Sequence, residues 1–271
     1  MTSIKLFGDF DKYLLKLWFE EFQITRYIYK EPILDSMTVD LIKRLCNALK
    51  QDSHVFVMSV DILVQYIMIQ NNKNIVIEDQ VLIVLTVIFI CSKIAGEQSD
   101  LKPLVISKFY TNITEEDIAT KTVNLAEIHV LKTLHHRLPF FSRIDDLKTF
   151  LNVYLKDFKL RVDIVGLSVQ ILDIVYIYYR RLFYKLKNVY KQSPDALQTF
   201  QEVITNRLYL PSGILLCALE MTKLKHFMNT ETILDEISDL CNINRNHIEL
   251  LSRYIYDIIC VSGNSSSNTV I

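Results

Sequence analysis

The five prolines of this 271-residue chain fall where segments of helical periodicity begin or end, and none interrupts such a segment. Proline breaks a helix interior because it lacks an amide hydrogen and clashes with the preceding turn. Glycine is also scarce: the chain has five, where average usage of roughly 7% would give about 19. So few turn-forming residues exclude a turn-rich all-β fold and a collagen-like fibre. The sequence therefore predicts an all-α protein built from long helices.

Apolar residues recur with the spacing of amphipathic helices along most of the chain. In the first half, the predicted helices cover residues 9–29, 36–50, 55–70, 78–95, 101–109 and 114–134. In the second half, they cover residues 143–157, 162–191, 209–228, 230–241 and 244–261. Residues 263–271 are mostly small and polar, which predicts a disordered tail.

Two of the predicted helices carry more specific expectations. The helix over residues 36–50 is expected to present an apolar side formed by Met37, Leu41, Leu45 and Leu49. Thr114 is expected to cap the helix over residues 114–134. The run Thr-Glu-Glu-Asp that begins there offers a side-chain acceptor and carboxylates to the free amides of a first helical turn.

The longest apolar run, Val81–Cys91, predicts a helix buried on all sides, with Leu85 and Ile88 wholly enclosed. Its eleven residues fall short of the roughly 18–20 that cross a bilayer. The N-terminus lacks the charged and apolar regions of a signal peptide. The five cysteines are scattered without a C-x-x-C pair, which argues against a disulfide framework and a zinc site. We expect a soluble intracellular protein with no metal, no cofactor and no membrane contact.

The two halves of the chain share features at a shift of 130 residues. Cys91-Ser92-Lys93 falls on Met221-Thr222-Lys223, which closes an apolar helix in each copy. Thr114 falls on Asn244, and both residues are suited to cap a helix. The predicted domains are an N-terminal helix region (1–35), a first five-helix unit (36–137), a second five-helix repeat (138–262) and the tail (263–271).

Four segments resemble motifs of the cyclin family. Phe89–Ile94 is similar to the Leu-Ala-Ser-Lys end of the third cyclin-box helix, and Leu125–Leu134 resembles the Glu-x-x-x-Leu-x-x-Leu pattern of the fifth. Val60–Leu63 resembles part of the second helix, and Tyr209–Ile214 resembles the Pro-Ser-x-Ile start of a third helix in a second box. The resemblance implies the all-α cyclin fold, with two tandem five-helix cyclin boxes preceded by an N-terminal helix.

Within the family, the likeness is to cyclin-like proteins of meiotic recombination. It implies a non-catalytic protein of the nucleus, with the cytoplasm as a second compartment, that acts through protein contacts in crossover designation or maturation. One alternative is a regulatory subunit that activates a cyclin-dependent kinase. Another is a cyclin-fold DNA-binding transcription factor, although the formal net charge of −1 argues against direct nucleic-acid binding. The expected partners are therefore recombination factors or a kinase, with no small-molecule substrate.

The resemblance places a partner-binding site at Lys93 and Glu127, because the matching residues of cyclins lie together and contact a kinase. From the residues alone, Lys93 has a sufficient structural role, since a cation at a helix end favours the exposed carbonyls. A partner site and an internal brace therefore both stay open. The substrate-docking patch of cell-cycle cyclins is not expected, because Arg44 stands where those proteins have tryptophan.

The segment Tyr178–Lys191 mixes basic and aromatic residues. On a helical wheel, three cations share one side: Arg180, Lys187 and Lys191. Two more cations lie beside them, Arg181 and Lys185. The opposite arc is apolar and consists of Leu182, Phe183, Leu186 and Val189. The pattern predicts an amphipathic helix whose basic side is either simply solvated or a face for an acidic protein or DNA.

Catalytic motifs are not found in the sequence. It has no Gly-rich phosphate loop, no H-E-x-x-H and no nucleophile elbow. His135 and His136 are adjacent, so their side chains do not face one another on a helix, and no cysteine lies nearby to complete a metal site. We assign no catalytic residue and do not expect an enzyme.

Overall fold

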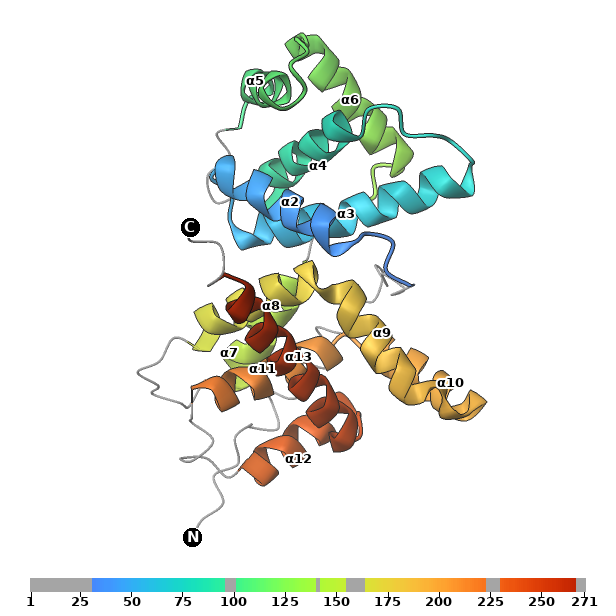
Figure 1. Cartoon of the computed structure of the whole chain (residues 1–271), viewed down its shortest axis with the longest axis vertical. Coiled ribbons are helices and arrows are strands. Elements are labelled where there is room, and N and C mark those ends of the chain that lie inside the picture. Colours follow the sequence, from blue (N-terminus) through green and yellow to red (C-terminus); the bar gives the residue numbers. More distant parts are fainter. Residues whose placement is uncertain (1–30, 96–100, 140–141, 155–163, 223–229, 267–271) are drawn as a thin grey trace. The chain divides into compact units, whose positions relative to one another are not determined.

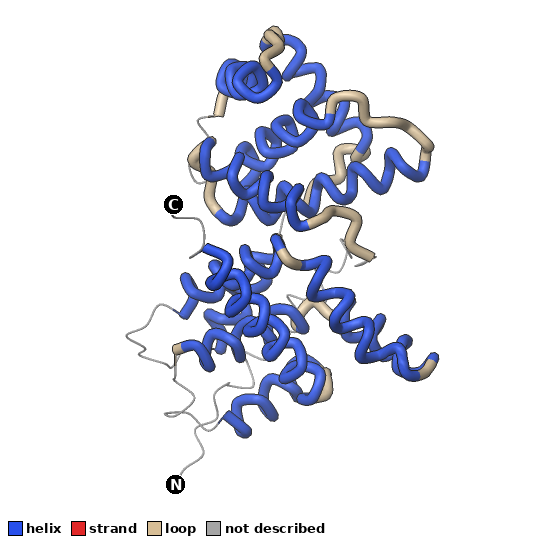
Figure 2. Tube along the Cα trace, in the orientation of Figure 1, coloured by secondary structure: helices blue, strands red, loops and turns tan. Residues whose placement is uncertain are grey.

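The computed structural model describes residues 31–95, 101–139, 142–154, 164–222 and 230–266, and within these ranges all regular structure is helical (Figures 1 and 2). The predicted all-α fold is thereby confirmed. Internal contacts divide the chain into two compact units. We call Ile33–Arg143 the N-terminal unit, and Ile144–Ile271 together with the residues up to Pro32 the C-terminal unit. The helix predicted over residues 9–29 lies outside the described residues.

The N-terminal unit is built around one apolar helix, α4 (Gln80–Ala95). Four helices pack against it: α2 (Ser36–Ala48), α3 (Ser53–Asn72), α5 (Pro103–Thr114) and α6 (Thr120–Thr133). Leu85 and Ile88 are fully buried, as predicted. Asp79 begins α4 by accepting a hydrogen bond from the Leu82 amide at 2.9 Å.

Helix α3 is the one described helix that is long and apolar enough to cross a membrane by length and composition. Within its apolar window, 56% of the residues are buried inside the protein. Phe56 and Ile62, for example, have no exposed surface. A core helix of a soluble protein has the same composition, so α3 is weak support for a membrane span.

The predicted apolar side of α2 is only half right. Leu45 and Leu49 are buried, but Met37 is 81% exposed and Leu41 is 53% exposed. Each step of four residues advances 400°, so three steps from Met37 to Leu49 turn the side chain by about 120° around the helix axis. The side that faces the core is instead formed by Val39, Ile42, Leu45 and Cys46.

Thr114 is not a helix cap, and that prediction was wrong. It is the last residue of α5, and its hydroxyl donates to the Tyr110 carbonyl at 3.0 Å. Glu115 then ends α5 in the left-handed conformation, with φ of 64°. Helix α6 begins only at Thr120, after Ala119 at the cap position. The acidic run therefore forms the connection between two helices, where Asp117 accepts a hydrogen bond from Thr111 Oγ1 at 3.2 Å.

The C-terminal unit is built around a second apolar helix, α11 (Tyr209–Met221). The helices around it are α8 (Ile164–Ile177), α10 (Pro194–Thr205), α12 (Thr230–Cys241) and α13 (Arg245–Ser266). Helix α13 lies so close to α11 that a Cβ atom on Gly213 would stand 2.5 Å from Leu251 Cδ2. The remaining described helices in this part of the chain are α7 (Arg143–Tyr154), α9 (Tyr179–Val189) and the short 3-10 helix Tyr190–Gln192.

Three predictions for the C-terminal unit need correction. The helix expected over residues 162–191 is broken at Tyr178, where φ is −103° and ψ is 16°, into α8 and α9 (Tyr179–Val189). Helix α10 was not predicted, although Ser193 caps it by accepting from the Ala196 amide at 3.1 Å. Helix α13 continues to Ser266, so the tail predicted from residue 263 begins too early.

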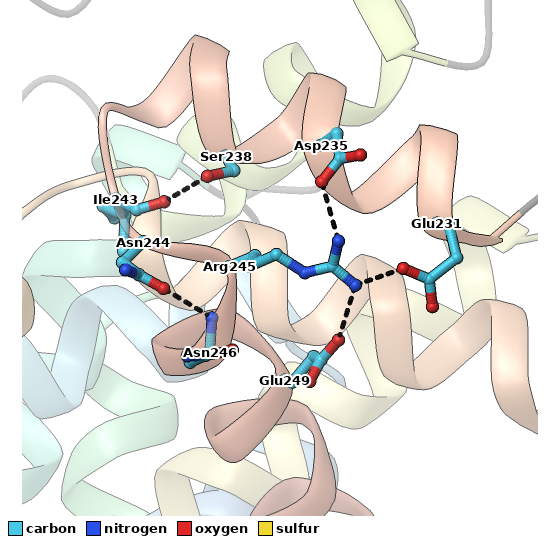
Figure 3. A network of polar contacts seen from close by, with 8 residues as sticks. All are labelled: Glu231, Asp235, Ser238, Ile243, Asn244, Arg245, Asn246 and Glu249. Atoms are coloured by element: carbon cyan, nitrogen blue, oxygen red, sulfur yellow. Dashed lines mark hydrogen bonds and ion pairs between the residues drawn. The ribbon is translucent and has the colours of Figure 1, made fainter.

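A polar network joins α12 to the start of α13 (Figure 3). The Arg245 guanidinium lies among three carboxylates, those of Glu231, Asp235 (2.9 Å) and Glu249 (3.4 Å). Asn244 caps α13 by accepting from the Asn246 amide at 3.0 Å. The predicted capping role of Asn244 is confirmed, in contrast to that of Thr114.

Candidate partner-binding site

Lys93 and Glu127 form an ion pair on the surface of the N-terminal unit. The distance between Lys93 Nζ and Glu127 Oε1 is 2.6 Å. The lysine side chain is 44% exposed and the glutamate side chain 18% exposed. Lys93 Nζ also lies 3.9 Å from the ring centroid of Phe89, where the negative face of the ring attracts a cation. The structure thus brings together the two residues that the sequence singled out.

The positions of the two charges follow from the helices that carry them. Lys93 lies in the last turn of α4, four residues after Phe89, so the two side chains lie on one side of the helix. Glu127 lies between Val123 and Val130, which are both fully buried, on the side of α6 that packs against α4. This placement explains why Glu127 is mostly covered while its carboxylate still reaches Lys93.

Large apolar side chains are exposed on the same two helices. Ile94 on α4 is 40% exposed, and Leu125 and Ile128 on α6 are 56% and 47% exposed. Leu125 and Ile128 are three residues apart and therefore share one side of α6. Exposed apolar residues on helices that also carry a charge pair are typical of a protein-interaction surface. Leu125 stands two residues before Glu127, about 200° away around the helix, so it lies on a different side of α6 from the carboxylate. The sequence reasoning named the charges and missed these apolar residues, although their spacing on α6 was visible.

A helical unit organised around a buried apolar helix, with this ion pair at its surface, has the architecture of the all-α cyclin fold. Comparison with protein families gives the same result: residues 13–139 match the family described as the cyclin N-terminal domain. This part of the chain, a little under half of its length, is therefore similar to a cyclin N-terminal domain. Such domains are generally regulatory and bind protein partners such as kinases. A comparison of the chain with curated proteins found no match.

The predicted basic side of α9 is divided in the structure. Lys185 pairs with Asp257 of α13 at 3.8 Å, and Lys187 pairs with Glu31 at 3.6 Å. Arg180, Arg181 and Lys191 are exposed. On the opposite arc, Leu182, Phe183 and Leu186 are buried as expected, but Val189 at the end of α9 is 38% exposed. The helix is amphipathic, and only part of its basic side is directed away from the rest of the protein.

Sequence reasoning missed a carboxylate on this basic side. The Tyr184 hydroxyl donates to Glu31 Oε1 at 2.7 Å, the same oxygen that Lys187 approaches. The Tyr184 hydrogen bond, followed by the charge of Lys187, holds the pKa of Glu31 below its usual value. Glu31 is 153 residues from Tyr184 in sequence, so no local spacing could have indicated the contact.

A second missed cluster lies between α3 and α6. The side chains of Tyr66 and Gln70 are buried, and the Gln70 amide nitrogen donates to the Tyr66 hydroxyl at 2.9 Å. His129 Nε2 lies 3.2 Å from the same hydroxyl. The cluster ties the two helices together by satisfying buried polar groups. Among the residues that the structure describes, no group of histidine, cysteine or acidic side chains is arranged to hold a metal ion.

Arg44 lies on the outer side of α2, where its side chain is 76% exposed and pairs with Asp40 at 2.7 Å. Met37 and Leu41 are exposed on the same helix. An apolar surface is therefore present here, but a charged pair takes the place of the tryptophan of cell-cycle cyclins.

Proposed function

We propose that the protein is a non-catalytic cyclin-type adaptor that works in the nucleus, through protein contacts, in the designation or maturation of meiotic crossovers. The observation that carries the protein-contact part is the Lys93–Glu127 pair on a cyclin-type domain, on helices that also expose Ile94, Leu125 and Ile128. An exposed ion pair contributes only about 0–1 kcal/mol to folding. Its position therefore suits the orientation of a partner better than the stabilisation of the fold.

The meiotic part of the proposal rests on sequence resemblance. Short segments are similar to cyclin N-terminal domain-containing protein 1, a meiotic crossover factor: residues 30–32, the Lys93 end of α4, Glu127–Leu134 and Leu172–Tyr176. Three of these segments lie wholly within described residues. The lysine and glutamate of the candidate site belong to two of them.

The C-terminal unit is proposed to be a second cyclin box. Its central helix α11 packs against α8, α12 and α13, as α4 packs against α3, α5 and α6 in the N-terminal unit. The break between α8 and α9 and the additional helix α10 are departures from a plain five-helix repeat. In this view the second box supplies a further surface for protein contacts.

A second candidate function is the activation of a cyclin-dependent kinase. It is favoured by the same ion pair, because in cyclins the matching lysine and glutamate contact the kinase. Affinity purification from gonad followed by mass spectrometry separates the two candidates. Recombination factors without a kinase are expected from the adaptor, whereas a stoichiometric kinase would overturn the adaptor in favour of the regulatory subunit.

Charge reversal tests whether the ion pair docks a partner. Lys93→Glu and Glu127→Lys should each abolish co-purification of the partner, with the melting temperature nearly unchanged. The double reversal should not restore binding, because the partner still meets the wrong charges. If the pair is only an internal brace, each single reversal lowers the melting temperature and the double reversal restores it.

Lys73→Glu is a matched control for Lys93→Glu. Lys73 also stands at the C-terminal end of a helix in the same unit, and it is exposed. Both changes replace a cation by an anion at a helix C-terminus, so the two variants share the same small helix-end cost. Loss of the partner in Lys93→Glu but not in Lys73→Glu would assign the effect to the site. Unchanged recovery in both site variants would reject the proposed docking role.

A further inference from the structure

Helix α9 carries a stripe of polar side chains that spans three of its turns and the short helix that follows. Arg180, Tyr184, Lys187 and Lys191 are separated by four, three and four residues, the spacing that keeps side chains on one side of a helix. Arg180 and Lys191, at the two ends, are exposed, and Tyr184 and Lys187, in the middle, are partly exposed. We call these four residues the α9 stripe.

The middle of the α9 stripe already holds a carboxylate. Glu31 Oε1 accepts a hydrogen bond from Tyr184 Oη at 2.7 Å and lies 3.6 Å from Lys187 Nζ. Glu31 comes from a non-helical segment that continues into Pro32, and its side chain is 56% exposed. The chain's own ligand for the stripe is therefore an acidic residue on a peptide segment, held at the surface where another segment could replace it.

Packing beneath the α9 stripe fixes the two groups that hold this carboxylate. The rings of Phe183 and Tyr184 meet edge to face, with centroids 5.6 Å apart. Phe183 is itself buried against Phe200, at a centroid distance of 5.4 Å. Lys187 Nζ lies 5.8 Å from the Phe183 ring centroid. The tyrosine and the lysine are thus anchored on a rigid aromatic base and are preorganised to bind an acid.

The charge of Glu31 does not neutralise the stripe. Arg180, Lys187 and Lys191 carry three positive charges against this one carboxylate, and Arg181 lies beside them. No described carboxylate pairs with Arg181 or Lys191. The pKa of Glu31 is lowered chiefly by the Tyr184 hydrogen bond and also by Lys187 and Arg180. The surroundings therefore favour a negative charge, and further acidic groups could bind on either side of Glu31.

We propose that the α9 stripe is a docking site for an acidic peptide segment of a protein partner, and that Glu31 competes in cis for its centre. The partner's segment places one carboxylate at Tyr184 and Lys187 in place of Glu31, and neighbouring carboxylates at Arg180 and Lys191. That the partner is a protein follows from the proposed function, on which this part of the proposal rests. The binding surface itself does not involve Lys93 or Glu127, so the two proposals can fail separately.

The dimensions of the stripe agree with a short peptide. From Arg180 to Lys191 the helix axis advances about 16 Å at 1.5 Å per residue. An extended peptide covers this distance with about five residues at 3.3 Å each. A peptide is favoured over DNA because the group that Tyr184 and Lys187 already hold is the carboxylate of a peptide segment, and because the Tyr184 ring packs on Phe183 rather than offering its face to a base. Three cations on a chain of net charge −1 also form a small footprint for a duplex.

The test uses the full-length protein and a fluorescein-labelled hexaglutamate peptide, with fluorescence anisotropy at near-physiological salt. Glu31→Gln should tighten binding about two- to fivefold, because removing the competitor frees an exposed ion-pair site. Arg180→Gln combined with Lys187→Gln should weaken binding about tenfold, and Tyr184→Phe should weaken it by a smaller factor. Labelled hexaglutamine should not bind.

Lys185→Gln is the matched control, because it removes the same charge from the same helix. Lys185 is directed to α13, where it pairs with Asp257 at 3.8 Å and lies 5.3 Å from the Tyr254 ring centroid. Its replacement should leave the peptide affinity unchanged. Equal losses in the control and the stripe variants, or no gain with Glu31→Gln, would overturn the proposal. Tighter binding of a labelled DNA duplex than of the peptide would also overturn it and assign the stripe to nucleic acid.

Discussion

The two units differ in what they expose, although each is built around a buried apolar helix. Among the described residues, ten large apolar side chains are exposed in the N-terminal unit and four in the C-terminal unit. The C-terminal unit instead has ion pairs centred on Arg207, Arg245 and the basic side of α9. Exposed apolar surface contributes affinity by its burial, whereas charge contributes mainly specificity and rate of encounter. The N-terminal unit is therefore the better candidate for a stable contact.

The central helices do not account for this difference. Helix α4 ends at the surface, with Lys93 and Ile94 exposed. Helix α11 is buried from Tyr209 to Leu219, and Gly213 allows α13 to lie directly against it. Helix α11 nevertheless reaches the surface at its C-terminal end, where Glu220 and Met221 are exposed as Lys93 and Ile94 of α4 are. The difference between the units therefore lies in the helices around the central one.

The largest expected contrast between the units is in thiol reactivity. Cys46 and Cys91 of the N-terminal unit are buried, as are Cys217 and Cys241 of the C-terminal unit, and Cys260 is exposed. Burial raises the pKa of both Cys217 and Cys241 to about 12. Because the thiolate is the reactive form, iodoacetamide at pH 8 should label Cys260 alone, as measured by peptide mass spectrometry. Rapid labelling of any other cysteine would show that its unit opens.

Core truncation should have the next largest effect and should act on each unit separately. Leu85→Ala and Leu215→Ala each remove a fully buried side chain. The cost should be about 2–5 kcal/mol in each case, from the lost transfer free energy and the cavity. Labelling of Cys91 and of Cys217 during urea unfolding reports the two units. If either substitution shifts the urea midpoints of Cys91 and Cys217 labelling equally, the two units unfold together and do not have separate stabilities.

The fold was largely predictable because the signals are local. Helical periodicity and the eleven-residue apolar run predicted an all-α protein and the burial of Leu85 and Ile88. The errors occurred where local patterns allow two outcomes. Thr-Glu-Glu-Asp is typical of a helix start, but here Glu115 ends a helix in the left-handed conformation. The segment over residues 162–191 has no proline or glycine at Tyr178, so its break could not be anticipated.

The site was predictable only in part, for a different reason. Lys93 and Glu127 were singled out by resemblance to cyclin motifs, and packing of α4 against α6 brings them to 2.6 Å. The contact of Glu31 with Tyr184 depends on how distant segments meet, and no spacing within one helix encodes it. Which apolar side chains of α2 are exposed also could not be predicted from the sequence. Met37 and Leu45 are both apolar, and only packing in the folded protein distinguishes them.

A smaller effect is expected from acid, and it should be confined to the C-terminal unit. His247 Nδ1 is hydrogen-bonded to the Tyr190 hydroxyl, and burial holds the pKa of His247 below its usual value. The unfolded chain then takes up a proton more readily than the folded chain. Stability should be fully present above about pH 6.5, the usual histidine value, and should fall as the pH decreases through it. His247→Gln should flatten this dependence in melting curves; an equal slope in the variant would assign the loss to other groups.

The smallest expected effect compares the two ion pairs that involve the last helix of each unit. Glu127 of α6 and Asp257 of α13 are 130 residues apart, the same shift that relates the two halves of the sequence. Glu127 pairs with Lys93 of the central helix α4 at 2.6 Å, and its side chain is 18% exposed. Asp257 pairs with Lys185 of the peripheral helix α9 at 3.8 Å, and its side chain is 48% exposed.

Exposed ion pairs contribute about 0.2–1 kcal/mol to folding stability. Double-mutant cycles on folding stability, with each residue replaced by its amide or by glutamine, should give a coupling near the upper end of that range for Lys93–Glu127 and near zero for Lys185–Asp257. Equal couplings would mean that the central-helix pair has no special geometry. A coupling for Lys93–Glu127 well above this range would make it an internal brace, and the N-terminal unit would then lose its main claim to be the docking unit.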